Sequence, residues 1–429
     1  MKKESLSRPL ATIAVSLATI ASTPARAAAQ LVADAGFREA CEVLRLGDGL
    51  DVPEWLAFSR TPALRLDPAG RLYLNADSSP AVTVLDSDGG FVRYIGGEGE
   101  GPGEFAHVGG FGFVGDSVWL QHLFELHIAF FDSAGEHIRT EMDRGLPSSA
   151  PSLWRTSIPL AGGYGFYIPP ITDADPASGP SRSSDTGDGR SGSGPRLSIT
   201  RAPEFKRVKL PMLVGLRSEE ARDTLAFKYN YTAMITPMST HGHEPFVTPP
   251  LYRIHPNGEG VVTADWEPDH PDEVILRHYD LTGGLAGEVT IGSRLRGVSP
   301  AARDAFIDEG VEMAERTVEV ARRFGGEVPA NLRGAVTEGL LLYDYFEPIS
   351  TFFLTHDERV WLRDAAPSEG YEAVWVVLGP DGNPEFRVSA PSGITYKAAL
   401  GDRLWATGRT ELDVPYIVLY ELRSPGACG

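Results

Sequence analysis

The sequence predicts an all-β fold made of six repeated four-stranded units, and two observations predict it. The first is that short runs of alternating apolar and polar residues recur along the 429-residue chain. The second is that these runs are bounded by turn residues, with 47 Gly and 33 Pro in the chain. Such runs are typical of antiparallel strands, and many short strands with Gly and Pro turns favour an all-β domain. The clearest unit runs from Pro62 to Phe105, where four such runs are separated by turns.

The same unit recurs five more times. Its second strand follows a turn that carries Gly or Asp, and its third and fourth strands meet at another such turn, as in VLDSDGG from Val84. Asp supplies a hydrogen-bonding side chain in a tight turn and Gly supplies the positive φ. Six units of this kind predict a six-bladed β-propeller. The six second strands are Arg71–Leu74, Ser117–Leu120, Tyr164–Tyr167, Gly260–Thr263, Arg359–Leu362 and Arg403–Ala406.

The two ends of the chain are predicted to close this ring. The last unit has only three strands, and the N-terminal strand Glu42–Gly47 has no partner nearby in the sequence. We expect this strand to complete the last blade. Cys41 lies just before it and Cys428 lies just after the final strand. Antiparallel pairing of the two strands would bring these cysteines together, so we predict a disulfide between them, which an exported location permits.

The turn pattern and the loop Gly96–Phe105, with the sequence GGEGEGPGEF, resemble NHL-type six-bladed β-propellers of secreted bacterial proteins. The resemblance covers nearly all of the mature chain. It implies the fold, but this fold is used by binding proteins, lactonases and lyases alike. The Gly-rich loop is not a nucleotide-binding loop, because no Lys-Ser/Thr pair and no helix follow it.

The N-terminus has the pattern of a secretory signal peptide. Lys2 and Lys3 precede the apolar segment Leu10–Ile20, which is followed by small residues suited to cleavage. We therefore expect residues 1–29 to be removed, leaving residues 30–429 as a propeller in the periplasm or secreted. No other run approaches the ~20 apolar residues of a membrane span. The formal charge of −19 argues against nucleic-acid partners, and we expect a monomer.

Three segments interrupt the repeat. Residues 172–195 are rich in Ser, Gly, Asp and Pro and are predicted to be a disordered insertion. Residues 213–249 are long and irregular. Residues 299–326 are predicted to form one inserted amphipathic helix, with Ser299 as its N-cap and Pro300 as its first residue. All three fall on connections that reach the same face of a propeller, so we expect the functional site on this long-loop face.

Polar and aromatic side chains end the second strands on that face. Their convergence around the mouth of the central pore would suit a ligand site. Solvated strand ends are the alternative interpretation. His107 and His122 could share a metal ion at the pore mouth, and a divalent metal is the cofactor that remains open. The cluster His241, His243 and Glu244 is a second place for one. The strand-end candidates are Asn75, Asp265, Trp266, Arg363, Asp364 and Arg409.

No complete catalytic set is present in the sequence. There is no Gly-x-Ser-x-Gly at a strand-to-helix turn. We therefore expect a secreted or periplasmic propeller that binds a small molecule, glycan or peptide on its long-loop face, without catalysis. Two alternatives stay open. One is a metal-dependent lyase or lactonase at the pore, and the other is a scaffold for protein partners.

Overall fold

The computed structural model describes most of the chain after the N-terminal segment. The described residues are 35–49, 52–75, 80–122, 127–142, 157–160, 163–168, 206–218, 225–236, 239–242, 251–266, 270–280, 284–293, 295–323, 331–339, 344–364 and 373–428; within 157–242 only the backbone is described. The predicted signal peptide, the predicted disordered insertion 172–195, and the side chains of His241, His243 and Glu244 lie outside this description.

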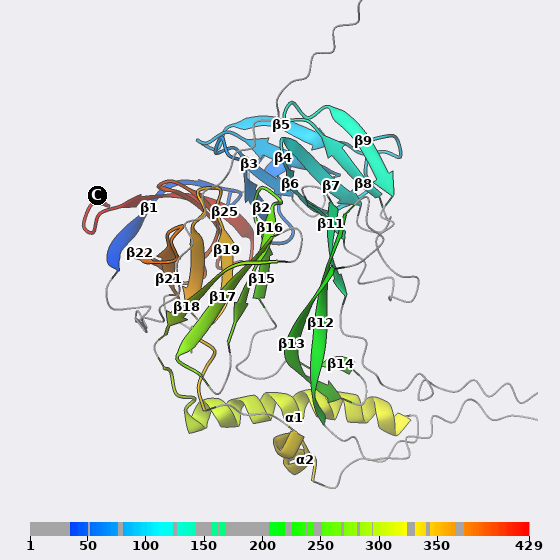
Figure 1. Cartoon of the computed structure of the whole chain (residues 1–429), viewed down its shortest axis with the longest axis vertical. Helices are drawn as coiled ribbons and strands as arrows, with labels where there is room; N and C mark the ends of the chain where they lie inside the picture. Colours follow the sequence, from blue (N-terminus) through cyan, green and yellow to red (C-terminus); the bar gives the residue numbers. More distant parts are fainter. Residues whose placement is uncertain are drawn as a thin grey trace, which may run out of the picture.

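The strands form antiparallel sheets that follow one another in chain order (Figure 1). The first sheet holds β2 (Ala63–Leu66), β3 (Leu72–Asn75), β4 (Ala81–Leu85) and β5 (Phe91–Gly96). The second holds β6 (Val108–Val114), β7 (Ser117–His122), β8 (His127–Phe131) and β9 (His137–Met142). The third holds β10 (Ser157–Leu160), β11 (Gly163–Ile168), β12 (Lys206–Ser218), β13 (Leu225–Thr236) and β14 (Ser239–Gly242).

Three more groups of strands complete the chain. The fourth sheet holds β15 (Leu251–Ile254), β16 (Gly260–Asp265), β17 (Glu273–Asp280) and β18 (Leu285–Gly292). The fifth holds β19 (Ile349–Leu354), β20 (Val360–Asp364), β21 (Ala373–Leu378) and β22 (Pro384–Ala390). The last holds β23 (Thr395–Leu400), β24 (Arg403–Arg409), β25 (Pro415–Arg423) and, from the start of the chain, β1 (Gly36–Leu46). A 3-10 turn, η1 (Glu54–Leu56), leads from β1 into the first sheet.

The apolar core lies between successive sheets. One cluster joins the fourth sheet to the fifth, one joins the fifth to the last, and one joins the first to the second. A further cluster packs the last sheet on the first, through Trp405 and Ile417 against Leu64 and Leu74. Sheets that pack face to face in chain order, with the last on the first, form a β-propeller.

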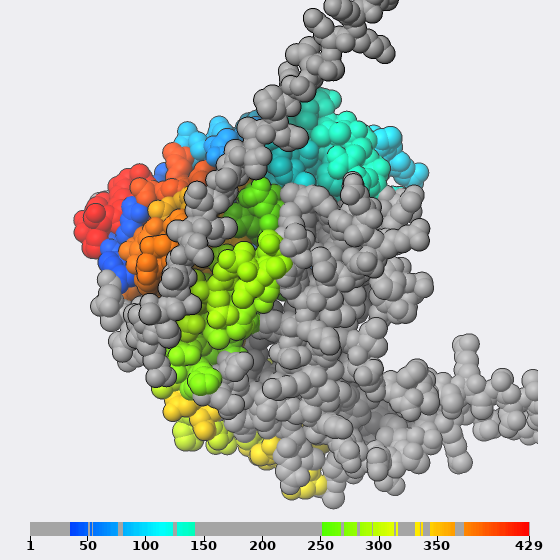
Figure 2. All heavy atoms as spheres, viewed as in Figure 1, coloured from blue at the N-terminus to red at the C-terminus, as the bar shows by residue number. Residues whose placement is uncertain are grey.

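The strand β1 links the last two groups of strands. Its first residues, Gly36–Arg38, pair in parallel with β22, and the rest of β1 pairs antiparallel with β25. Figure 2 shows the blue and red ends of the chain side by side. The strand is longer than the predicted Glu42–Gly47, because its extra residues find a partner in β22 that the sequence pattern does not reveal.

A disulfide joins Cys41 to Cys428, as the sequence predicted, with their Cα atoms 5.3 Å apart. Cys41 is paired opposite Glu421 in β25, and the tail after β25 turns so that Cys428 returns to β1. A turn hydrogen bond from the Ala427 amide to the Ser424 carbonyl shapes this tail. The bridge links residues 387 apart in the sequence.

The repeated turns are built by aspartate side chains. In the first sheet, Oδ1 of Asp67 accepts hydrogen bonds from the amides of Ala69 and Arg71, each at 2.9 Å. Asp86 and Asp132 make the same pair of bonds to the amides two and four residues later. The Asp-bearing turn that the sequence analysis identified is therefore one recurring hydrogen-bonded unit.

The connection between the fourth and fifth sheets contains two helices, where the sequence predicted one. Helix α1 (Pro300–Arg323) lies within the predicted range, and Oγ of Ser299 caps it by accepting from the Ala302 amide at 3.1 Å. Helix α2 (Leu332–Gly339) contacts α1 (Figure 1) and is capped by Asn331, which accepts from the Gly334 amide at 2.9 Å. The sequence LRGAVTEG gives little helical signal, because it is short and contains two Gly and a Val-Thr pair.

The segment 213–249 is not irregular through most of its length. Residues 206–218 form β12 and residues 225–236 form β13, and the two strands pair antiparallel from Lys206↔Ile235 to Leu216↔Leu225. Pro211 and Gly215 interrupt the apolar alternation of β12, so the sequence pattern does not indicate a strand there. Among the described residues, no helix is both long and apolar enough to cross a bilayer.

Candidate functional site

The strand-end residues predicted to bind a ligand are largely engaged with the protein itself. Asn75 donates from Nδ2 to the Ala81 carbonyl at 3.4 Å. Asp265, which is buried, accepts from the guanidinium of Arg277 and from Oγ1 of Thr263. These bonds fix Asn75 at the end of β3 and Oδ2 of Asp265 at the end of β16, while the buried Oδ1 of Asp265 accepts no hydrogen bond within the described residues.

The other strand-end residues behave similarly, with one exception. Nε1 of Trp266 donates to the Pro271 carbonyl at 3.3 Å, and Arg409, which is exposed, pairs with Asp413 at 2.8 Å. Asp364 forms an ion pair with Arg296. The exception is Arg363, whose buried Nε has no hydrogen-bond partner among the described residues.

Of the two histidines proposed for a metal, His122 ends β7 of the second sheet and His107 immediately precedes β6. His122 is opposite Val108 in the β6–β7 register, so His107 lies close to it along the backbone. The His122 ring stacks on Phe105, with ring centroids 6.2 Å apart. Within the described ranges, the one group of three His, Cys, Asp or Glu residues close enough to share an ion includes both disulfide cysteines, which cannot offer thiolates.

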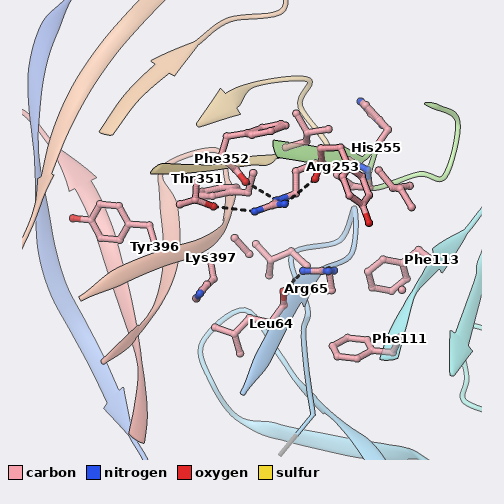
Figure 3. A pocket seen from close by; sticks show the side chains of 18 of the residues that line it. Leu64, Arg65, Phe111, Phe113, Arg253, His255, Thr351, Phe352, Tyr396 and Lys397 are labelled. Atoms are coloured by element: carbon pink, nitrogen blue, oxygen red, sulfur yellow. Dashed lines mark hydrogen bonds between the residues drawn. The ribbon is translucent and has the colours of Figure 1, made fainter. Parts of the chain in front are cut away.

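A cavity of about 480 Å³ lies at the centre of the sheets and was not among the predicted sites. It is lined mainly by β2, β6, β15, β19 and β23, each of which is the first strand and an edge of its group, with Trp119 of β7 and Trp375 of β21 behind them. These strands bring residues from opposite parts of the chain around one hollow (Figure 3). This is the position of the central channel of a propeller.

The wall of this channel combines apolar and aromatic side chains with three cations. The cations are Arg65 of β2, Arg253 of β15 and Lys397 of β23, and they lie around the same hollow (Figure 3). We call them the channel cations. The apolar wall includes Phe111, Phe113, Trp119, Tyr252, Phe352 and Tyr396.

The channel cations have neutral partners or none among the described residues. Arg253 donates to the Phe352 and Tyr252 carbonyls, both at 2.7 Å, and to Oγ1 of Thr351 at 2.9 Å. Arg65 donates to the adjacent Leu64 carbonyl at 3.1 Å. Lys397 has no hydrogen bond or ion pair within the described part of the chain.

The pKa of each channel cation is lowered. Removal of the charged group from solvent is the largest cause for all three, although Arg65 keeps an exposed side chain, so the effect on Arg65 is the weakest part of this pattern. The neighbouring charges of Arg253, Arg363 and Arg65 lower the pKa of Lys397 further, and Arg253 lowers that of Arg65. The charges therefore repel one another across the channel, and Arg363 belongs to the same electrostatic group.

Carboxylates near the ends of the channel are already paired with other arginines. Asp67 pairs with Arg71 at 2.6 Å. Asp357 forms an ion pair with Arg359. These pairs lie in the turns that follow β2 and β19. The nearby acidic groups thus stabilise turns and do not neutralise the channel.

A pair of histidines lies near the end of the channel formed by these same turns. His255 follows β15 and lines the cavity, and its Nδ1 is 2.6 Å from Oδ1 of Asn257. His356 follows β19 and reaches the first sheet, where Nε2 is 2.8 Å from the Leu66 carbonyl oxygen. The imidazole of His356 also approaches Phe113, at 6.2 Å between ring centroids.

Sequence reasoning missed the channel cations because it examined the ends of the second strands and not the first strands. The available signal was a single cation inside an otherwise apolar strand. It occurs in ALRL at Arg65, in LYRI at Arg253 and in TYKAAL at Lys397. A cation at such a position is costly to bury unless it has a partner or a function.

No protein-family model matches the sequence, and no curated protein matches it. Solved structures are similar to it only remotely. A DUF4221 family member from Bacteroides vulgatus is 10% identical, with a TM-score of 0.44 over 90% of this chain and 98% of that one. A putative exported protein from Bacteroides fragilis is 12% identical, with a TM-score of 0.42 over 89% and 95%. The β-propeller domain of Myceliophteria thermophila Cps50 (Swd1) is 9% identical, with a TM-score of 0.33 over 89% and 99%. These similarities are too remote to indicate a function. The β-propeller fold is inferred from the arrangement of the sheets in this structure.

Proposed function

We propose that this chain is an exported six-bladed β-propeller that binds a small molecule in its central channel, without catalysis. The count of six blades is supported by the third sheet, which falls in chain order between the second and the fourth. Pairing of β1 with β25 supports closure of the ring by the N-terminal strand. Export is supported by the signal-peptide pattern of residues 1–29 and by the disulfide, which suits an oxidising compartment.

The observation that carries the binding function is the cavity itself. Its volume of about 480 Å³ suits a small ligand, since ligand sites are typically about 300–1,000 Å³. Its wall is mainly apolar and aromatic, with a few polar groups that come from separate strands. Such a wall provides area for the body of a ligand and fixed points for its orientation.

The strand ends at the long-loop face are the second candidate for the site. Asn75, His107, His122, Asp265, Trp266, Arg363, Asp364 and Arg409 would then form the binding surface. We favour the channel for two of its cations. Within the described residues, Arg65 makes one side-chain hydrogen bond, to the neighbouring Leu64 carbonyl, and Lys397 makes no side-chain hydrogen bond or ion pair, whereas the strand-end Asp265 and Arg409 are in ion pairs. Of the strand-end residues, Arg363 fits both sites, since it interacts electrostatically with Lys397.

A thermal-shift screen of small molecules, glycans and peptides would test this function. Compounds that raise the Tm of the wild type would then be tested on two variants. Thr395→Trp narrows the channel, because Thr395 lines the cavity and is half-buried. Arg409→Ala removes an exposed strand-end side chain. We expect the shift to be lost in Thr395→Trp and kept in Arg409→Ala. The opposite result would move the site to the strand ends, and a screen without any hit would count against a binding function.

A further inference from the structure

We propose that the ligand of the channel is a small organic anion, a carboxylate or phosphate ester, whose acidic group is held by Arg65, Arg253 and Lys397. This inference rests on the proposed binding function and names the class of ligand. It is carried by the convergence of three cations from three separate sheets on one cavity (Figure 3).

The channel cations have N–H groups that make no hydrogen bond within the described residues. A guanidinium offers five N–H groups and an ammonium three. Among the described residues, Arg65 uses one of its groups in a hydrogen bond and Arg253 uses three, while Lys397 uses none. An anion can accept several of these at once, and hydrogen bonds between charged groups are about twice as strong as neutral ones.

The backbone around Lys397 is altered at this position. Tyr396 pairs with Ala406 and Ala398 pairs with Trp405, so the register shifts and Lys397 has no residue opposite it in β24. A β-bulge changes the direction of a side chain and is over-represented beside functional sites. The bulge here belongs to the strand that brings an unpaired ammonium to the cavity.

The arrangement is unfavourable without an anion. The like charges of Arg253, Arg363 and Arg65 act on Lys397. Lys397 and Arg253 are half-buried, while Arg65 is exposed. Buried charges are ordinarily paired, because an unpaired one costs free energy. The chain as a whole is acidic, with a formal charge of −19, so a cationic group without nearby carboxylate partners is not a result of composition. A bound anion would offset the repulsion.

The rest of the wall indicates that the anion has an organic body. Phe113 and Tyr252 line the same cavity and are each half-buried, whereas Phe111 and Phe352 are buried in the wall behind them. A bare inorganic anion would fill only a small part of about 480 Å³ and would not contact the apolar part of the wall. A ring-shaped or sugar-like body that carries the acidic group would contact both kinds of wall.

The test is isothermal titration calorimetry of the full mature chain with two matched pairs of probes. Galacturonate is paired with galactose, and glucose 6-phosphate with glucose, so that each pair differs mainly in an acidic group. The two pairs distinguish a carboxylate from a phosphate ester. We expect at least one anion to bind about tenfold or more tightly than its neutral partner. Lys397→Met and Arg65→Met should each weaken the binding of that anion about tenfold. Arg423→Met, at an exposed arginine of β25 that does not line the cavity, should leave it unchanged.

The outcomes separate this inference from the proposed function. Equal affinity within both pairs, or no binding of either anion, would overturn the inference. A neutral compound from the screen that binds the wild type and not Thr395→Trp would still support the channel site. An anion whose affinity is unaffected by Lys397→Met and Arg65→Met would also overturn the inference. Circular dichroism of each variant confirms that it is folded, and agreement between the two variants guards against a local defect in one.

Discussion

His356 donates a hydrogen bond from Nε2 to the carbonyl oxygen of Leu66 at 2.8 Å, between residues 290 apart in the sequence. The carbonyl can only accept, so the hydrogen of the neutral imidazole must be on Nε2. The bond joins the first turn of the fifth sheet to the innermost strand of the first sheet. It therefore spans the end of the channel, and its protonation state affects the folded protein.

We predict that this contact makes the protein sensitive to acid. The pKa of His356 is lowered, and burial of the imidazole is the largest cause. The charge of His255 lowers this pKa further. The hydrogen bond to Leu66 and the charges of Asp67 and Asp357 raise it, but they do not outweigh burial. A histidine with a lowered pKa in the folded state stabilises the protein above its ordinary pKa of about 6.5, and this stability is lost as pH falls through the folded value. Urea unfolding between pH 8 and 5 should show this loss.

The variant His356→Gln is the control for this effect. Glutamine can donate to the Leu66 carbonyl but does not titrate, so the stability of the variant should be within about 1 kcal/mol of wild type at pH 8. Its loss of stability toward pH 5 should be smaller. Some loss should remain, because burial and His255 also lower the pKa of His278. An unchanged pH profile would show that His356 does not carry the effect.

Replacement of Lys397 by methionine should stabilise the protein in the absence of ligand. The change removes one of several charges that repel one another in a partly buried site. We expect the free energy of unfolding to rise by about 0.5–2 kcal/mol. Lys397→Arg keeps the charge and should give no such gain. If Lys397→Met destabilises the protein, the ammonium must have a compensating partner.

The glycine at position 89 should be sensitive to replacement because of the packing of the last strands on the first sheet. Gly89 has φ +87°, and a Cβ there would lie 2.3 Å from Cδ2 of Leu44 and 3.6 Å from Cη2 of Trp405. Gly89→Ala should lower the free energy of unfolding through backbone strain and, in addition, by about 1–3 kcal/mol through the steric clash of the new Cβ with Leu44. Gly393, with φ +78° and open space around it, is the matched control, and its alanine variant should lose only about 1–2 kcal/mol. Equal losses of unfolding free energy in the two variants, measured by chemical denaturation, would mean that the Leu44 side chain moves aside at little cost.

Reduction of the Cys41–Cys428 bridge should lower stability substantially. The closed loop is very long, with a sequence separation of 387. The chain-entropy model gives about 6 kcal/mol for such a loop, and measured gains for other proteins are often about 2–4 kcal/mol. Denaturant unfolding with and without reductant, together with the double Cys→Ser variant, would measure the loss. Two free thiols in the exported, unreduced protein would contradict the bridge.

The sequence predicted those parts of the fold that local chemistry determines. The Asp67 and Asp86 turns follow from side chains that bond amides two and four residues later, and such spacings are visible in the sequence. The Cys41–Cys428 pair follows from the antiparallel pairing of the chain ends. The extension of β1 toward β22 depends on a partner more than 340 residues away, and no local pattern encodes it.

The channel that we propose as the site was not predicted from the sequence, for a physical reason. Arg65, Arg253 and Lys397 are far apart in the sequence, and each alone resembles a solvated cation within a strand. Only the ring arrangement brings them to one cavity, and only then does the shortage of carboxylate partners become visible. The strand-end residues were conspicuous because they are polar, yet intramolecular bonds such as Asp265 to Arg277 explain several of them.

The most direct test of the account is a crystal structure of the protein with the anion that binds most tightly in calorimetry. We predict that its acidic group lies within hydrogen-bond distance of at least two of Arg65, Arg253 and Lys397, with its body against Phe113 or Tyr252. Ligand density at the strand ends around Asn75 and Arg409, with none in the channel, would contradict the account.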